Sequence, residues 1–201
     1  LHYGWPKKDD PQEITGEGWL MSDHGSPPWP VYHLYHNTIV MRGTSWRVYY
    51  GSGTARGTQG TRRRVFNNII LHVNGKPGFR VPDAKDDWAA DGQLQWSLPE
   101  APEPADAKAL LKDANRKGYP DTWASHDIVA DPKFVDFQPE RFSSNDLRLQ
   151  PDSPAVNAGV EVPDEWPDPV RALDEGRPDI GAVPVGVEVW RIGVRGRLSP
   201  F

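Results

Sequence analysis

The stretch VYHLYHNTIVMRG, residues 31–43, is aromatic and β-branched and ends in glycine, which is typical of short strands followed by a turn. Residues 62–75, RRRVFNNIILHVNG, repeat this texture after a loop of small residues, GSGTARGTQGT. The two segments align without gaps at an offset of about thirty residues, so that Tyr35–Val40 lies over Val65–Ile70. A repeat of this length is typical of a solenoid, whose coils stack roughly 4.8 Å apart.

The offset predicts which residues of neighbouring coils lie over one another. Ile39 would stack on Ile69 in the core. Asn37 would stack on Asn67 at a bend that also holds His36, because asparagine tolerates unusual backbone angles and its amide can bond along the stack. Because the pattern occurs only twice, there are two alternatives to a solenoid: a chance similarity of the two segments, or two separate hairpins.

Three short apolar segments follow later in the chain: SHDIVADPKFVD at 125–136, DLRLQPDSPAVNAG at 146–159 and RPDIGAV at 177–183. Their prolines end strands, and Gly159 and Gly181 permit tight bends. We expect Asp131, Asp152 and Ser153 to form turns and not a catalytic site. The side chains predicted to be buried are those of Val129, Phe134, Leu147, Leu149, Val156 and Ile180.

The order and spacing of these three segments resemble the ending of bacterial right-handed parallel β-helix proteins of the pectate-lyase-like superfamily. DGQLQW at 91–96, and the cores HNTIV and FNNII, add to a resemblance that spans roughly residues 31–183. It implies an all-β fold, a right-handed parallel β-helix (solenoid) with a short helical excursion and a C-terminal cap. Lyases, glycoside hydrolases and epimerases share this ending, so it indicates the fold and not the reaction.

We expect three regions along the chain. Residues 1–30 form a loop-rich segment that continues from missing coils, residues 31–183 form the coils and the capping tail, and residues 184–201 form a strand extension. The helical excursion is predicted at 104–117. Since two recognisable coils precede the tail and the chain begins at Leu1, we expect further N-terminal coils, or another chain, to cover the first coil.

The composition excludes several classes of protein. The 9 Trp, 6 Tyr and 6 Phe among 201 residues argue against disorder, and a net charge of −5 argues against a nucleic-acid partner. The chain has no cysteine, which excludes disulfides, thiolate metal sites and cysteine catalysis. No apolar run approaches the length of a membrane span.

Proteins that resemble this chain commonly carry a sugar-binding groove along one strand face. A lyase acting on uronic acids needs a cation to neutralise the substrate carboxylate and a base for the neighbouring proton, whereas a hydrolase needs two carboxylic acids. The offset of thirty places His33 beside Arg63 and Tyr32 beside Arg62, which makes His33 and Arg63 catalytic candidates. The same offset sets Leu34 against Arg64, which a core would not tolerate, so a solvated arginine turn is the alternative.

Asp23 and His24 form a second catalytic candidate, although neighbours on a strand point to opposite faces. For substrate binding, the candidates are the rings of Trp29, Tyr32 and Tyr35, together with Arg62; core packing is the alternative for the rings. His72 and His126 have no partner visible in the sequence and receive no role.

Calcium is the one candidate cofactor. The densest acidic group is Asp83, Asp86, Asp87 and Asp91. It carries no calcium-loop signature, so a solvated loop is the alternative.

We therefore expect a carbohydrate-active protein outside the cytoplasm, whether secreted, periplasmic or on the cell surface, that cleaves an acidic polysaccharide by β-elimination. A glycoside hydrolase on the same fold is one alternative. Another is a non-catalytic structural or adhesive surface solenoid that assembles with another chain. The expected partner is a polysaccharide, with no nucleic acid and no membrane span.

Overall fold

A computed structural model describes residues 2–3, 5–6, 14–15, 17–18, 31–41, 45–46, 48–49, 62–73, 79–80, 88–98, 124–141, 145–168 and 171–188. Of Tyr32 and Arg63 it describes the backbone alone. The helix predicted at 104–117 lies outside the described residues.

The described chain is essentially all-β, and its two largest sheets, of three and five strands, are parallel. The three-stranded sheet has the order β12-β9-β5 and consists of β5 (Val31–Tyr35), β9 (Arg62–Phe66) and β12 (Trp88–Asp91). The five-stranded sheet has the order β1-β6-β10-β13-β14. Its strands are β1 (His2–Tyr3), β6 (Thr38–Met41), β10 (Ile69–His72), β13 (Leu94–Ser97) and β14 (Ile128–Val129).

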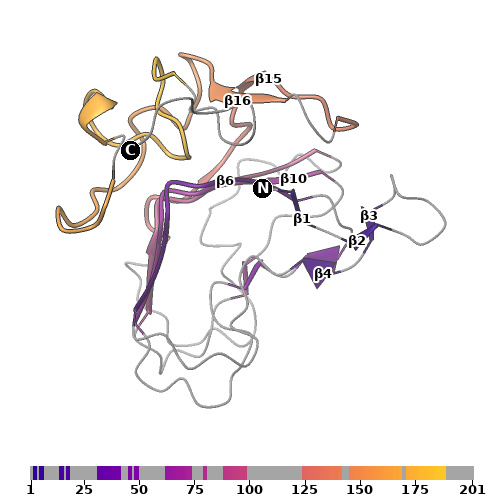
Figure 1. Ribbon diagram of the computed structural model, residues 1–201, viewed down its shortest axis with the longest axis horizontal. Helices are drawn as coiled ribbons and strands as arrows, with labels where there is room; N and C mark the ends of the chain where they lie inside the picture. The colour runs from indigo at the N-terminus through magenta and orange to yellow at the C-terminus, as the bar shows by residue number, and fades with distance from the viewer. Residues whose placement is uncertain are drawn as a thin grey trace, which may run out of the picture.

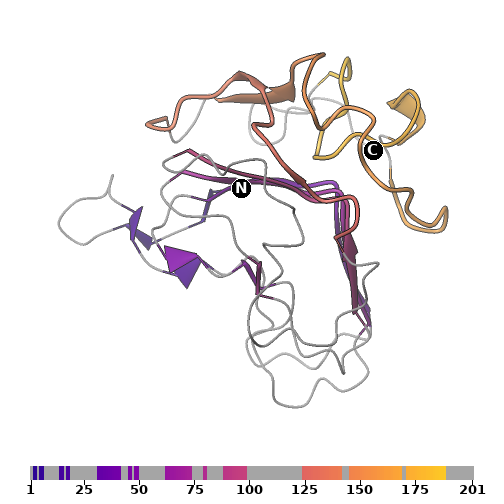
Figure 2. The same cartoon turned by 180° about the vertical axis from the view of Figure 1, so that it is seen from behind.

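The two sheets meet at a corner that the chain passes three times (Figures 1 and 2). Strands β5, β9 and β12 continue after two residues into β6, β10 and β13. The first corner residue has a positive φ each time: 50° at His36, 55° at Asn67 and 71° at Gly92. Asparagine and glycine adopt this conformation readily and histidine less so, which makes the FNN and DGQ sequences suitable corners.

The strand register differs by one residue from the predicted offset. Ile39 pairs with Ile70, and Asn37 bonds to Asn68, 31 residues further on. The predicted stacks of Ile39 on Ile69 and of Asn37 on Asn67 are therefore wrong. The true register pairs Leu34 with the fully buried Val65, so that Arg64 does not lie opposite Leu34.

A line of side-chain hydrogen bonds, here named the amide ladder, joins Asn37, Asn68, Gln93 and Asp127. The main-chain N–H and the amide of Asn37 donate to Oδ1 of Asn68 at 3.1 and 2.9 Å. Asn68 donates in the same way to Oε1 of Gln93, at 3.1 and 2.9 Å. The Gln93 N–H donates to Oδ1 of Asp127 at 2.8 Å. The ladder satisfies polar groups that the corner removes from water.

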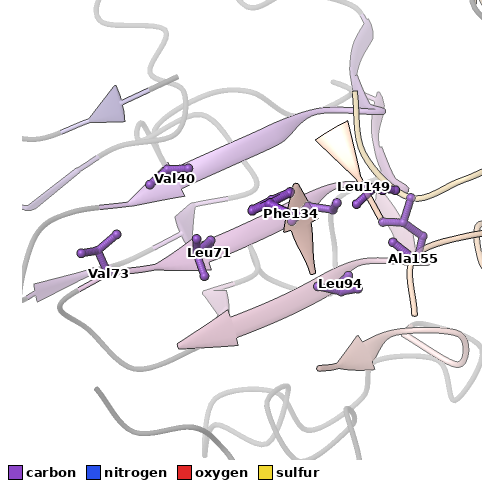
Figure 3. Packing of buried hydrophobic residues seen from close by; sticks show 9 residues of the cluster. Val40, Leu71, Val73, Leu94, Phe134, Leu149 and Ala155 are labelled. Carbon is purple, nitrogen blue, oxygen red and sulfur yellow. The ribbon is translucent and has the colours of Figure 1, made fainter. Parts of the chain in front are cut away.

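The C-terminal tail, which follows β14 in the chain, packs on one face of the five-stranded sheet (Figures 1 and 2). It contains an antiparallel pair, β15 (Phe134–Asp136) and β16 (Asp146–Leu149). Alternation along the strands turns Val40, Leu71 and Leu94 towards the tail (Figure 3). The apolar cluster consists of Val40, Ile69, Leu71, Val73, Leu94, Phe134, Leu149, Ala155 and Ile180.

The predicted core and turn residues of the tail are confirmed. Val129, Phe134, Leu149 and Ile180 are buried, and Leu147 and Val156 pack partly buried against the cluster. Asp131 Oδ1 accepts from the Lys133 N–H at 2.9 Å, and Ser153 Oγ accepts from the Ala155 N–H at 3.1 Å. Asp152 forms an exposed ion pair with Lys133 at 2.7 Å.

Shorter elements complete the described chain: β2 (Trp5–Pro6), β3 (Ile14–Thr15), β4 (Glu17–Gly18), β7 (Ser45–Trp46), β8 (Val48–Tyr49), β11 (Phe79–Arg80) and the 3-10 segment η1 (Arg171–Leu173). Strands β2 and β3 pair antiparallel, whereas β4 pairs with β7 and β8 with β11 in parallel. Residues 184–188 of the predicted strand extension form a turn instead, in which the Val187 N–H donates to Pro184 O at 3.2 Å. The rest of that extension lies outside the described residues.

Candidate functional site

One face of the three-stranded sheet carries polar and aromatic side chains. His33 pairs with Arg64, and Tyr35 pairs with Phe66. Because side chains alternate along a strand, these four lie on the face opposite to Leu34 and the buried Val65. We name this surface the outer face; its members are His33, Tyr35, Arg62, Arg64, Phe66, Asp91 and, from the tail, Trp166.

Trp166 brings the tail onto the outer face. Its indole stacks on the His33 ring, with centroids 3.9 Å apart and planes inclined by 27°. It also packs at 5.3 Å from the Tyr35 ring and at 5.8 Å from the Phe66 ring. The Tyr35 hydroxyl donates to Pro167 O at 2.6 Å, which holds the loop in place. The result is an aromatic surface built from two strands and a distant loop.

The charges around His33 favour its neutral form. Burial, followed by the guanidinium groups of Arg64 and Arg62, lowers the pKa of His33, and Glu165 opposes the shift. A neutral imidazole can accept a proton. Burial, helped by Asp168, raises the pKa of Tyr35, so its hydroxyl keeps its proton.

Asp91 holds a second histidine at the other edge of the outer face. Strand β12 ends at Asp91, which pairs with Phe66. The two Asp91 carboxylate oxygens accept bonds from the N–H groups of Gly92 and His126, at 2.9 and 2.7 Å, and from the Ser125 hydroxyl at 3.1 Å. The carboxylate also lies 2.7 Å from Nδ1 of His126. The His126 side chain is 54% exposed and that of Asp91 14%, so the pair presents its ring to solvent.

Asp127 follows His126 in the chain and forms the end of the amide ladder. Burial raises the pKa of its carboxyl to about 8; the nearby Asp91 adds to the shift, while the N–H groups of Gln93 and Gly92 oppose it. The neutral form avoids placing a second negative charge near Asp91.

The corner beside Tyr35 is closed by the tail. His36 Nε2 lies 3.3 Å from the Asn67 amide nitrogen and 3.6 Å from the Asp168 carboxylate. Asn67 bonds to the backbone of Val160, donating to its carbonyl at 2.7 Å and accepting from its N–H at 2.8 Å. His36 therefore belongs to the corner, as predicted, and its contacts there are structural.

Some of the predicted site residues lie on the outer face, and others lie outside the described part of the chain. His33, Tyr35 and Arg62 all belong to the outer face. The predicted pairings of His33 with Arg63 and of Tyr32 with Arg62 are wrong, because the offset of 31 residues pairs His33 with Arg64 and Tyr32 with Arg63. The predicted residues that lie outside the described part of the chain are Asp23, His24 and Trp29 of the site, and Asp83, Asp86 and Asp87 of the acidic group.

Sequence reasoning assigned no site role to Arg64, Phe66, His126 or Trp166 and placed Asp91 only in an acidic group. An offset of 31 would have found Arg64. Asp91 and His126 are separated by 35 residues and Trp166 is far from both, and no sequence pattern connects them.

Within the described side chains, no group of three or more histidines, cysteines or carboxylates could hold a metal ion. In the same part of the chain, no helix has the length and hydropathy required to cross a membrane. Comparison of the chain with protein-family models, curated proteins and solved structures gave no match.

Proposed function

We propose that this chain folds as a right-handed parallel β-helix and that its outer face binds an acidic polysaccharide and cleaves it by β-elimination. The fold proposal is supported by two parallel sheets in which β5, β9 and β12 lead in turn into β6, β10 and β13. The amide ladder, which repeats its bonds at each corner, supports it as well. A polysaccharide substrate implies a location outside the cytoplasm.

The chemistry of the outer face supports an acidic sugar as ligand. A uronic acid offers a carboxylate and an apolar ring face. An arginine guanidinium matches a carboxylate in charge and geometry, and aromatic rings offer flat apolar surfaces. The observation that carries the proposal is the pairing of Arg64 with His33, on whose ring the Trp166 indole stacks.

The same residues suit an elimination. Arg64 would neutralise the substrate carboxylate and so acidify the proton on the adjacent carbon. Neutral His33 would accept that proton, the carbon–oxygen bond to the leaving sugar would break, and a carbon–carbon double bond would form. A hydrolase instead needs two available carboxyl groups. The Asp91 carboxylate on this face is occupied by four contacts, and Glu165 and Asp168 lie near His33 and Tyr35 at the other edge.

The test is incubation of the full chain with a panel of acidic polysaccharides, with calcium and with a chelator, followed by ultraviolet absorbance of the unsaturated product. We expect absorbance to rise with at least one substrate. His33→Ala should lower the rate about 100-fold or more, whereas Asp136→Asn, in an exposed ion pair of the tail, should not. Reducing sugar without unsaturation would favour a hydrolase, and binding without any product would favour a non-catalytic solenoid.

A further inference from the structure

Removing a proton beside the carboxylate completes half of an elimination, because the departing oxygen must also receive a proton. We propose that His126, positioned by Asp91, is the general acid that supplies it. This inference rests on the proposed function and assigns a role to a pair that the His33–Arg64 chemistry leaves unused.

The hydrogen bonds of His126 fix both its backbone and its ring. Its N–H donates to Asp91 Oδ1 at 2.7 Å, and its Nδ1 lies 2.7 Å from Asp91 Oδ2. With Nδ1–H directed at the carboxylate, Nε2 is the ring nitrogen that can exchange a proton with a ligand. The exposure of 54% for this side chain gives a ligand access to it.

The strand register places His33 on one side of Arg64 and Asp91, to which His126 is hydrogen-bonded, on the other. Arg64 pairs with His33 of β5 on one side and with Ala89 of β12 on the other. Asp91 follows two residues after Ala89 on the same face, so its Cα lies about 8 Å from that of Arg64 on the spacing of a parallel sheet. A sugar acid bound to Arg64 would therefore lie between the two histidines.

The imidazole rings of His33 and His126 have different charged neighbours, and the difference matches the roles of proton acceptor and proton donor. His33 lies near the guanidinium groups of Arg62 and Arg64, which suits a proton acceptor. His126 faces the carboxylate of Asp91 and the hydroxyl of Ser125, which suits a proton donor. Burial raises the pKa of the nearby Asp127 carboxyl to about 8, so the Asp127 carboxyl stays protonated below about pH 8 and adds no second negative charge beside the pair.

The step balances without an oxidant or a reductant. His33 takes the proton from the carbon beside the carboxylate, and that carbon–hydrogen electron pair becomes the double bond. The bond to the leaving oxygen breaks with both electrons on oxygen, which takes the proton from Nε2 of His126. Proton exchange with water returns both rings to their starting states.

A purely structural role makes a different prediction. Asp91 also accepts from the main-chain N–H groups of Gly92 and His126, and these bonds alone would brace the corner. These main-chain hydrogen bonds do not involve the His126 imidazole, so they remain when the side chain is replaced. If the pair is only a brace, His126→Gln should leave catalysis unchanged.

The experiment compares His126→Gln and His126→Asn with the wild type on two substrates. One is an acidic polysaccharide that the wild type cleaves, and the other is a uronide whose leaving group is a nitrophenol, which departs without protonation. We expect kcat to fall about 100-fold or more on the polysaccharide and to change less than about threefold on the nitrophenyl substrate. Asp91→Asn, which removes the carboxylate that positions the ring, should likewise lower kcat more on the polysaccharide than on the nitrophenyl substrate.

Asp136→Asn serves as the control, and thermal unfolding with polysaccharide binding shows that each variant is folded. Equal losses on both substrates, or no loss on either, would overturn the role of His126. If the wild type produces no unsaturated product from either substrate, the proposed elimination fails, and this inference fails with it. If the wild type eliminates and His126→Gln matches it, the inference alone fails.

Discussion

The side chain of Asn68 accepts, at one oxygen, both the main-chain N–H of Asn37 at 3.1 Å and its amide at 2.9 Å. Its own amide nitrogen donates to Leu34 O at 3.1 Å and to Gln93 Oε1 at 2.9 Å. Asn68 is fully buried, so water cannot replace these bonds. One side chain thus joins three successive passes of the chain through the corner.

We expect Asn68→Ala to lower the free energy of unfolding by about 2–4 kcal/mol, since it leaves several buried polar groups without partners. Denaturant unfolding measures the change. Asn145→Ala is the matched control, because Asn145 also bonds to backbone groups, of Gln138 and Arg141, but at the surface. Similar losses in the two variants would contradict a special role for the ladder.

Asp127 predicts a dependence of stability on pH. The pKa of its carboxyl is about 8 in the folded chain against an ordinary value of 3.8, so the folded state binds more protons between these two values. Its contribution to stability is therefore complete below about pH 4 and is lost as the pH rises towards 8, by up to about 1.4 kcal/mol per pH unit.

Asp127→Asn keeps the acceptor oxygen for the Gln93 N–H but cannot ionise. We expect the variant to be more stable than the wild type at pH 8 and the advantage to shrink as the pH falls to 4. Thermal or denaturant unfolding across this pH range tests the prediction. Parallel pH profiles for the two proteins would show that Asp127 is not the titrating group.

Part of the fold could be predicted from the sequence, because similar residues recur at the corners where the chain turns from one sheet to the other. HNT and FNN mark two corners, and the tail residues that the sequence predicts to be buried are buried or partly buried against the apolar cluster. The register was not predictable from the pattern, because Asn67 and Asn68 are adjacent and either could match Asn37. An offset of thirty sets Leu34 against Arg64, and this mismatch indicates that the offset is wrong. At the observed offset of 31, Leu34 pairs with Val65.

The site was harder to predict, because its members come from passes of unequal length. Successive ladder residues are separated by 31, 25 and 34 positions, so no fixed period relates His33 to Asp91 or His126. Trp166 reaches the outer face through tertiary packing of the tail, which no local periodicity encodes.

Gly181 lies where the tail meets the first corners. It has a φ of 113°, and a Cβ there would lie 2.7 Å from Ile69 Cδ1 and 3.0 Å from Thr38 Oγ1. We expect Gly181→Ala to destabilise the chain by about 2–4 kcal/mol, through backbone strain and a clash in a packed core. Gly186→Ala is the control, with a φ of 81° but open space around its Cβ, and should cost about 1 kcal/mol. Equal losses by denaturant unfolding would refute a packed contact at Gly181.

Trp166→Ala should raise the pKa of His33. Burial is the largest cause that lowers this pKa, and the stacked indole is part of the cover. Titration of the histidine ring by NMR in wild type and variant measures the shift. Leu173→Ala, at an exposed position of the tail, is the control and should leave it unchanged. If the His33 titration is unchanged in Trp166→Ala, the indole does not contribute to the lowered pKa of His33, and the shift must be attributed to Arg62 and Arg64 alone.

Arg64 should dominate the affinity for an acidic ligand. Arg64→Ala removes a charge-assisted hydrogen-bond donor, and the loss of about 1.5–3 kcal/mol corresponds to a Kd roughly 10–100 times weaker. Arg64→Lys should fall between Ala and the wild type, because lysine keeps the charge and loses the planar pair of donors. Affinity measured at low and high salt should show a smaller salt dependence for Arg64→Ala. Arg148→Ala is the control, since Arg148 is paired with Asp146 on the tail. If Arg64→Ala binds as the wild type does, the carboxylate must be recognised elsewhere, and the outer face loses its place as the site.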